Sequence, residues 1–230
     1  MRVTVPHYFD FGKDRDLVGS DLVRPEAWDA LRTRTSGPFA LPATREEWEA
    51  VADDREDIRR RAESLDAWLS ERGVGTLASY GVGGATLELW LHRLSPERTL
   101  RLADYTPLTV ERLSHLFPVA DVQLHDLLRD EPLEADLHLF HRIDTEFDHE
   151  QWRRLFQRFR PRRVLLVATE VVGLRRILAE LPRLALNRRR ATRAGLMRTA
   201  DAFEALWQPT HRGERFKLHD LDAWELHPHG

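Results

Sequence analysis

The chain contains no cysteine among its 230 residues. Disulfide bonds, thiolate zinc sites and cysteine nucleophiles are therefore excluded. Lysine is scarce as well, because only Lys13 and Lys217 accompany the many arginines. The formal net charge is −3, so the chain has no overall positive field that would favour nucleic acid as a partner.

Long apolar runs are also missing. No stretch of roughly 18 apolar residues occurs, so no transmembrane helix and no membrane partner are expected. Residues 1–7 lack the apolar segment of a signal peptide, and we therefore expect a cytoplasmic protein. Hydrophobic residues still make up 42% of the chain, which is enough for a sizeable core. The length suits one α/β domain with an extension, or at most two small domains.

Residues 1–73 predict a helical extension or cap that begins with a short strand at 2–5. Thr44 and Glu47 form a capping box, in which the threonine caps and the acid lies three residues on. We expect one helix from there to about residue 71. Its apolar stripe has helical spacing and consists of Trp48, Val51, Ile58, Ala62, Leu65 and Leu69.

From Val74 onward, short apolar runs alternate with helical patterns. Strands that are covered on both faces read as such runs, and the alternation implies parallel strands joined by right-handed crossovers. Residues 74–230 therefore predict a Rossmann-like domain, and the fold class is α/β with a doubly wound, mostly parallel sheet. Two final runs predict a C-terminal antiparallel hairpin. Strands are expected at 74–80, 98–104, 119–124, 135–141, 163–169, 214–219 and 223–227, and helices at 84–94, 107–116, 148–160, 171–181 and 200–207.

The first apolar run of this domain ends in a glycine cluster, Ser79-Tyr80-Gly81-Val82-Gly83-Gly84-Ala85. Glycine lets the backbone approach a ligand closely. The next run ends in Asp104, about 20 residues beyond the turn, where an acid can accept hydrogen bonds from ribose hydroxyls. We expect Asp104 at the exposed end of its strand. This layout is typical of a nucleotide-binding βαβ unit, although a turn without ligand and an Asp104 that merely caps the next helix remain alternatives.

A site for nicotinamide adenine dinucleotide (NAD) is disfavoured. Its fingerprint needs a glycine three residues after Gly83, and Thr86 occupies that place. The order of the motifs instead resembles the class I S-adenosylmethionine-dependent methyltransferases over residues 74–228. The resemblance rests on the glycine turn, on Ala103-Asp104-Tyr105-Thr106, on Leu124-His125-Asp126-Leu127, on the run from Ala135 to Asp144 and on Pro161-Arg162-Arg163-Val164-Leu165-Leu166-Val167.

This resemblance implies S-adenosylmethionine (SAM) as the cofactor and a small molecule as the substrate. It implies that Asp104 binds the ribose and that Asp126 holds the adenine amino group. The whole implied cofactor site comprises Ser79, Tyr80, Gly81, Gly83, Asp104, Tyr105, Asp126, Leu127 and Phe140. Ser79 departs from the family, which usually has an acid there that helps to bind the amino group of the cofactor. A serine can accept a hydrogen bond but brings no charge.

Histidine and acidic residues gather between residues 138 and 149. His138 and His141 lie three apart on an expected strand, so they should point to opposite faces, and no metal site is predicted. His141 closes that strand at the edge where open α/β sheets bind ligands. It is the candidate catalytic residue, a general base near neutral pH, or else a polar residue that orients a loop.

Residues 183–198 carry only basic charges and are expected to be a solvated helical face rather than a phosphate contact. Three hypotheses remain. The first is a SAM-dependent methyltransferase that acts on a small molecule. The second is a methyltransferase-like binding or assembly protein without catalysis, which Ser79 keeps open. The third is an RNA or protein methyltransferase, supported only by residues 183–198. The sequence leaves open whether the chain forms a homo-oligomer.

Overall fold

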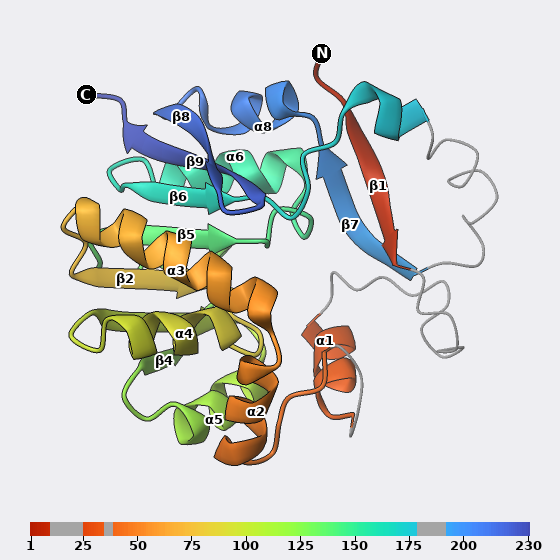
Figure 1. Ribbon diagram of the computed structural model, residues 1–230. Helices are drawn as coiled ribbons and strands as arrows, with labels where there is room; N and C mark the ends of the chain where they lie inside the picture. Colours follow the sequence, from red (N-terminus) through yellow and green to blue (C-terminus); the bar gives the residue numbers. More distant parts are fainter. Residues whose placement is uncertain (10–24, 35–38, 179–191) are drawn as a thin grey trace.

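The computed structural model describes residues 1–9, 25–34, 39–178 and 192–230. A seven-stranded sheet lies at the centre of the molecule, in the strand order β4-β3-β2-β5-β6-β9-β8 (Figure 1). Its strands are β2 (Thr76–Tyr80), β3 (Thr99–Asp104), β4 (Asp121–Leu124), β5 (Leu137–His141), β6 (Val164–Val167), β8 (His211–Leu218) and β9 (Leu221–Pro228).

The sheet confirms the predicted doubly wound topology. Strands β2 to β6 run parallel, β9 is antiparallel to β6, and β8 and β9 form the expected hairpin at the edge. The chain builds the sheet outward from β2 to β3 and β4, and then returns to the other side of β2 with β5. In open α/β sheets, a crevice for ligands forms at such a reversal, outside the carboxyl ends of the strands.

Helices cover both faces of the sheet (Figure 1). One face carries α2 (Arg45–Asp53), α3 (Glu56–Glu71) and α4 (Thr86–Leu94), and the other carries α6 (His149–Arg158) and α8 (Ala200–Trp207). The helix α5 (Pro107–Leu116) packs beside β3 and β4, and α1 (Pro25–Arg32) packs against α5.

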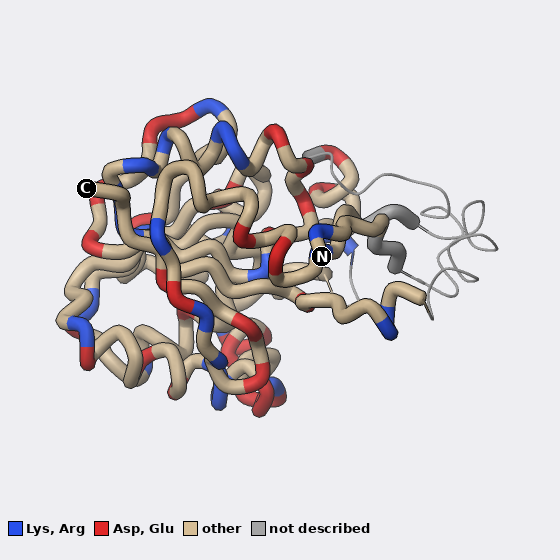
Figure 2. The backbone as a smooth tube through the Cα atoms, turned by 90° about the horizontal axis from the view of Figure 1, so that it is seen from above, with Lys and Arg blue, Asp and Glu red and all other residues tan. Residues whose placement is uncertain are grey.

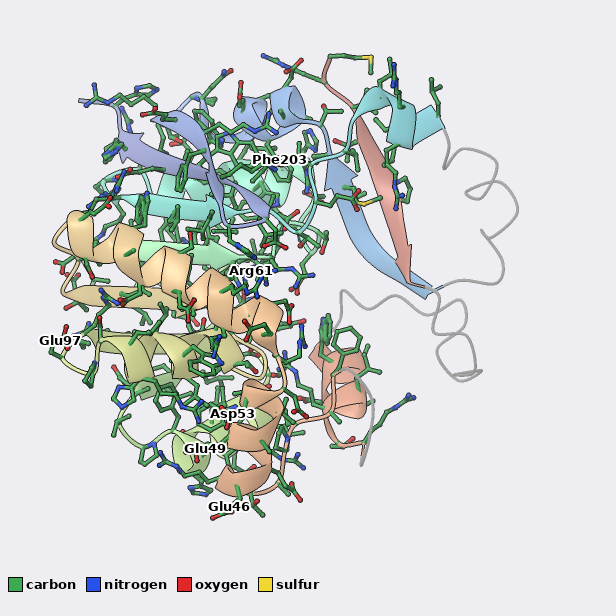
Figure 3. The ribbon with its side chains drawn as sticks, in the orientation of Figure 1. Glu46, Glu49, Asp53, Arg61, Glu97 and Phe203 are labelled. Atoms are coloured by element: carbon green, nitrogen blue, oxygen red, sulfur yellow. The ribbon has the colours of Figure 1, made fainter. Side chains whose placement is uncertain are left out.

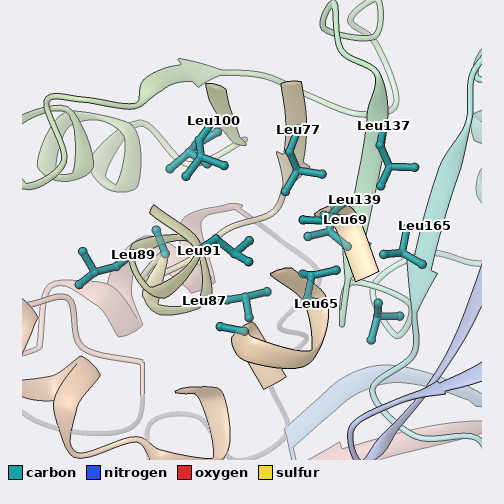
Figure 4. Close-up of a cluster of buried hydrophobic side chains, with 14 of the residues drawn as sticks. Leu65, Leu69, Leu77, Leu87, Leu89, Leu91, Leu100, Leu137, Leu139 and Leu165 are labelled. Atoms are coloured by element: carbon teal, nitrogen blue, oxygen red, sulfur yellow. The ribbon is translucent and has the colours of Figure 1, made fainter. Parts of the chain in front are cut away.

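Each face of the sheet has its own hydrophobic cluster, because neighbouring side chains of a strand point to opposite faces. Leu77 of β2 packs with leucines of α3 and α4, as Figure 4 shows. Ala78 and Tyr80 belong to the other cluster, which α6 and α8 cover with aromatic rings. The apolar runs of the sequence are therefore buried on both sides, as expected for parallel strands.

The N-terminal extension shares the first cluster. Trp48 of α2 and Leu65 of α3 are almost completely buried beside Leu87 and Leu91 of α4. The boundary between residues 73 and 74 thus lies within a continuous core. The division of the chain into two domains there stays a prediction.

The single helix expected from Thr44 to residue 71 is wrong. The Thr44 hydroxyl accepts a hydrogen bond from Glu47 N at 3.2 Å, so the cap forms as predicted. The helix then ends at Asp53, and α3 begins at Glu56 after Arg55, whose backbone is not helical (φ −103°, ψ 70°). The break lets α2 and α3 each place an apolar side on α4.

A second, two-stranded sheet stands apart from the first (Figure 1). It pairs β1 (Thr4–Phe9) with β7 (Thr192–Arg198) in antiparallel fashion. The expectation of a basic helical face is therefore wrong for 192–198, where Gly195 adopts a φ of +127° and the segment pairs with β1. The rest of that expectation, and the last part of the helix predicted at 171–181, lie outside the described residues.

Basic and acidic residues alternate along much of the described chain, as Figure 2 shows. Among the helices of the described residues, none is both long enough and apolar enough to cross a bilayer.

We expect Leu65→Ala to lower the free energy of unfolding by about 2–5 kcal/mol, because it leaves a cavity in a core that α3, α4 and the sheet share. Urea denaturation measures the change. Leu94→Ala, at a side chain that is 40% exposed, is the matched control and should change stability by less than about 1 kcal/mol. Equal effects of the two substitutions would show that the extension does not share the core.

Candidate functional site

The glycine turn after β2 adopts a backbone that most residues avoid. Gly81, Gly83 and Ala85 have φ values of +66°, +55° and +48°. Gly81 N donates a hydrogen bond to the carbonyl of Ala103 at 2.7 Å, which ties the turn to β3. A Cβ atom on Gly81 would lie 2.6 Å from Cγ2 of Ile143, so position 81 requires glycine for its space as well as its conformation.

Three cavities meet at Gly81. Cavity A, of about 220 Å³, lies toward the ends of β3 and β4. Cavity B, of about 160 Å³, lies between the end of β2 and the start of α4. Cavity C, of about 330 Å³, lies between the glycine turn, the N-terminal helices and the end of β5. Their characteristic lining residues are Tyr105, Asp126 and Leu127 in A, Ser79, Glu88 and His141 in B, and Trp28, Trp48 and Arg142 in C.

Cavity A contains five of the predicted cofactor residues. Tyr105, Asp126 and Leu127 line it together with Gly81 and the buried Tyr80. The Asp126 carboxylate accepts a hydrogen bond from Leu128 N at 2.9 Å and lies 3.3 Å from the Arg129 guanidinium. These contacts fix the carboxylate at the rim of the cavity.

Asp104 ends β3 as predicted, but it is only 1% exposed and lines none of the three cavities. The Arg32 guanidinium of α1 covers it, with Nη1 3.0 Å from Oδ1 and Nη2 3.4 Å from Oδ2. Gly83 N donates to Oδ2 at 3.1 Å, and Thr106 N donates to Oδ1 at 3.0 Å. The expectation of an acid at an exposed strand end is therefore wrong, because a helix from the extension closes over it.

Arg32 is itself held in place. It is 7% exposed, and its Nη1 also donates to the hydroxyls of Thr106 and Thr109 at the start of α5. Its guanidinium packs near the Trp28 ring, 5.6 Å from the centroid. The extension thus contributes a buried cation to the site, which the sequence motifs did not indicate.

Ser79 points to the face of the sheet that α4 covers. Its side chain is buried, and its hydroxyl donates a 2.6 Å hydrogen bond to the Glu88 carboxylate. Glu88 is 3% exposed, and burial raises its pKa to about 7, against the opposing effect of the Ser79 hydrogen bond. Sequence reasoning missed Glu88, although it is the one acid in the apolar segment 84–94.

The side chains of Tyr80, His138 and Phe140 pack in the core on the opposite face of the sheet, which α6 and α8 cover. The Tyr80 hydroxyl lies 3.1 Å from His138 Nδ1 and accepts a hydrogen bond from Leu133 N at 3.0 Å. Phe140 is fully buried against Trp152 and other rings and lines none of the three cavities. Its side chain is therefore committed to packing.

His141 ends β5 and lines cavities B and C, as its position in the sequence predicts. Burial lowers its pKa to about 3, and the nearby positive charges of Arg61 and Arg142 act in the same direction. Figure 3 shows Arg61 reaching from α3 toward this end of the strands. The imidazole is therefore neutral at physiological pH, and its low pKa makes it a weak base.

The loop after β5 is pinned from several sides. Arg142 has a φ of +60°, a strained value for a residue with a side chain, and Thr169 Oγ1 donates to its carbonyl at 3.1 Å. The buried Asp144 carboxylate accepts from Thr169 N at 2.6 Å, and Arg198 of β7 donates to the Asp144 carbonyl at 2.5 Å. These contacts fix the direction of the next side chains.

Glu146, in this loop, lines both cavity A and cavity C. Burial raises its pKa to about 7, the charge of Asp104 raises it further, and Arg32 opposes them. Glu146 therefore changes its charge near neutral pH at the junction of two cavities. The sequence predicts the loop 141–147 as a substrate contact, but no motif singles out Glu146 within it.

His138 and His141 lie on opposite faces, as the strand geometry predicts. Within residues 1–9, 25–34, 39–178 and 192–230, no three histidine or acidic side chains gather closely enough to hold a metal ion.

No family model and no curated protein matches the sequence. Solved structures do match the fold. Human N-acetylserotonin methyltransferase, in complex with SAM, has 19% identity and a TM-score of 0.64 over 92% of this chain and 64% of that chain. The mitomycin 7-O-methyltransferase MmcR has 19% identity and a TM-score of 0.58 over 74% of this chain and 54% of that chain.

CalO1, a methyltransferase in calicheamicin biosynthesis with S-adenosylhomocysteine (SAH) bound, has 24% identity and a TM-score of 0.53 over 67% of this chain and 49% of that chain. The chain has the fold of the class I SAM-dependent methyltransferases. It spans 64% or less of the length of these three proteins. Within the methyltransferase fold, cavities A to C lie at the carboxyl ends of the strands where the sheet order reverses.

We expect Asp104→Asn to lower the free energy of unfolding by about 3–5 kcal/mol, because it leaves the Arg32 guanidinium buried without its counter-charge. Urea denaturation of this variant, of Arg32→Met and of the double variant measures the coupling, and the double variant should lose less than the sum. Asp53→Asn, in an exposed ion pair with Arg93, should change stability by less than about 1 kcal/mol. Additive effects at positions 32 and 104 would contradict the ion pair.

We expect Glu146→Gln to be more stable than the wild type at pH 8, by an amount that is absent at pH 4.5. A raised pKa means that the folded protein binds more protons than the unfolded chain between pH 4.5 and about 7, so wild-type stability falls as the pH rises through this window. Glutamine does not titrate, so the variant should gain about 2–3 kcal/mol over the wild type across it. Chemical denaturation at both pH values measures this gain, and Glu150→Gln at the surface should show none.

Proposed function

We propose that the chain is a methyltransferase that uses SAM and acts on a small molecule. The observation that carries this proposal is the meeting of three cavities at Gly81, where the order of a methyltransferase-type sheet reverses. The solved structures of the same fold include complexes with SAM and SAH. Fold alone does not fix an activity, so the proposal rests on how the residues at this junction suit the reaction.

The residues of cavity A fit a nucleoside. Tyr105 and Leu127 offer flat and apolar surface for a base, and Asp126 offers a carboxylate at the rim that can accept a hydrogen bond from an exocyclic amine. Tyr105 is held neutral, because burial raises the pKa of its hydroxyl. When bound, SAM would supply an activated methyl group for in-line transfer, which leaves the protein to position the reactants and exclude water.

Asp104 fits a ribose only after a movement. Its carboxylate must lose the Arg32 guanidinium before two ribose hydroxyls can donate to it. Arg32 belongs to α1, a helix of the extension that packs against α5. Cofactor binding is therefore coupled to a displacement of α1 or of the Arg32 side chain, and the ion pair weakens the apparent affinity.

Cavity C suits the substrate. Trp28, Phe39 and Trp48 give it aromatic walls, and Gly81 and Glu146 connect it with cavity A. Its volume of about 330 Å³ falls within the usual range for small-molecule sites. The aromatic walls come from residues 1–73, so the extension would shape the substrate specificity.

Glu146 is the better-placed proton acceptor. It lines both cavities, and its pKa of about 7 matches the needs of a general base near neutral pH. His141 remains a candidate by position, but its pKa of about 3 leaves it a poor acceptor. In the step itself, Glu146 would take the proton of the accepting hydroxyl or amine as that atom bonds to the methyl carbon and the carbon–sulfur bond breaks.

A binding protein without catalysis is the second candidate. The Arg32–Asp104 ion pair favours it, because that contact fills the place of the ribose. An RNA or protein substrate has less support, since only residues 183–198 suggest it and the formal net charge of −3 gives no overall field that favours nucleic acid.

We expect calorimetric titration to show binding of SAH and SAM and no comparable binding of NAD. Arg32→Met should tighten SAH binding, because the ribose hydroxyls no longer compete with a guanidinium for Asp104. Arg154→Met, on the exposed side of α6, should leave the affinity unchanged.

Binding of NAD without binding of either sulfur compound would refute the cofactor assignment. Binding of SAM without methyl transfer to any member of a broad panel of phenols and amines would favour the non-catalytic candidate. Transfer that Glu146→Gln abolishes, with SAH affinity intact, supports the assignment of the base.

A further inference from the structure

Cavity B contains a buried carboxyl group that has no counter-charge. Glu88 is 3% exposed, and its hydrogen-bonding neighbour is the neutral hydroxyl of Ser79, 2.6 Å away. Among the described residues, no cation forms an ion pair with Glu88. A buried carboxylate is costly unless a cation or several hydrogen bonds accompany it.

Three other buried or half-buried acids of the domain differ in this respect. Asp104 is paired with Arg32, and Glu225 is paired with Arg163 and Arg72. Asp144 accepts two hydrogen bonds from Thr169 and lies near Arg198. Glu88 alone of these four combines burial, a cavity at its side and no cation within the described chain. It is therefore set up to receive a cation from outside the protein.

The size and the polar groups of cavity B define that cation. The cavity holds about 160 Å³ and shares Gly81 in its lining with cavities A and C, so its size and place suit a small charged end of a ligand that also occupies a neighbouring cavity. His141 lines the same cavity, and its Nε2 has no hydrogen-bond partner among the described residues. Ser79, Glu88 and the neutral His141 can together offer acceptors for the three N–H groups of a primary ammonium.

We propose that cavity B binds the ammonium group of the amino-acid part of the cofactor, with the carboxylate of Glu88 supplying the negative charge that Ser79 lacks. The inference rests on the proposed function. In this chain the charge has moved from the end of β2 to the first turn of α4, where the helix dipole also favours an anion. The hydrogen bond from Ser79 holds the carboxylate toward the cavity.

The test compares two ligands that differ only beyond the nucleoside thioether. SAH carries the amino-acid part, and 5′-methylthioadenosine lacks it. We expect the wild-type chain to bind SAH at least tenfold more tightly than methylthioadenosine in calorimetric titrations. Glu88→Gln keeps the size of the side chain and removes its charge. It should weaken SAH binding by about 10- to 100-fold, as loss of a charge-assisted hydrogen bond does, and change methylthioadenosine binding by less than about threefold.

Two further variants guard against a merely structural effect. Glu97→Gln, at the exposed acid just beyond the other end of α4 (Figure 3), is the matched control and should bind both ligands as the wild type does. Ser79→Asp combined with Glu88→Gln restores a charge on the strand side of the same cavity. It should recover at least tenfold of the lost SAH affinity, a gain that a poorly folded variant cannot show.

Each outcome decides a separate question. If the wild type binds neither ligand, the proposed function fails and this inference fails with it. If the wild type binds both ligands equally, or if Glu88→Gln weakens both equally or neither, the proposed function stands and the role of Glu88 is overturned. Selective loss of SAH binding with rescue by Ser79→Asp establishes the ammonium site.

Discussion

The parallel pairing of β2 with both β3 and β5 is the constraint on which the rest of this structure depends. The sheet grows from β2 in both directions, to β3 on one side and to β5 on the other. The chain segments that follow the carboxyl ends of β3 and β5 therefore run apart. The backbone after β2 must then turn sharply, and Gly81 does so at a φ of +66° while it bonds to Ala103 of β3. The three cavities of the site share Gly81 of that turn. Cavity A lies toward β3 and β4, and His141 at the end of β5 lines both cavity B and cavity C.

Buried charge governs the chemistry available around the turn. Asp104 is paired with Arg32, and hydroxyl and backbone groups that bond to the two close this corner of the site. Glu88 and Glu146 have no such pairing, and burial raises the pKa of each to about 7. The corner at Asp104 is therefore closed to a ligand. At the other two corners the carboxyl groups of Glu88 and Glu146 are costly to bury in charged form, and each lines a cavity that a ligand can occupy. Carboxyl groups with such raised pKa values, placed beside a cavity, are typical of functional sites.

Much of the fold was predictable, because short apolar strands and amphipathic helices leave clear periodic patterns. The helix at 107–116, the C-terminal hairpin and the glycine turn all lie where their patterns placed them. The helix expected from 44 to 71 breaks at Arg55, whose backbone is not helical, and α2 and α3 each pack on α4. Residues 192–198 form a strand because β1, nearly two hundred residues earlier, pairs with them. Both differences arise from contacts between distant segments, which a local pattern does not contain.

The sequence by itself determined the α/β topology, the position of the turn and the presence of Tyr105, Asp126 and Leu127 beside it, because strand ends and loops follow directly from local patterns. Only the tertiary structure decided which polar groups face one another there. Arg32 reaches Asp104 across 72 positions, and Glu146 comes to lie between two cavities because β7 and Thr169 fix its loop. Electrostatic partners and burial depend on distances in space, and so the charges of this site follow from packing between segments that no motif connects.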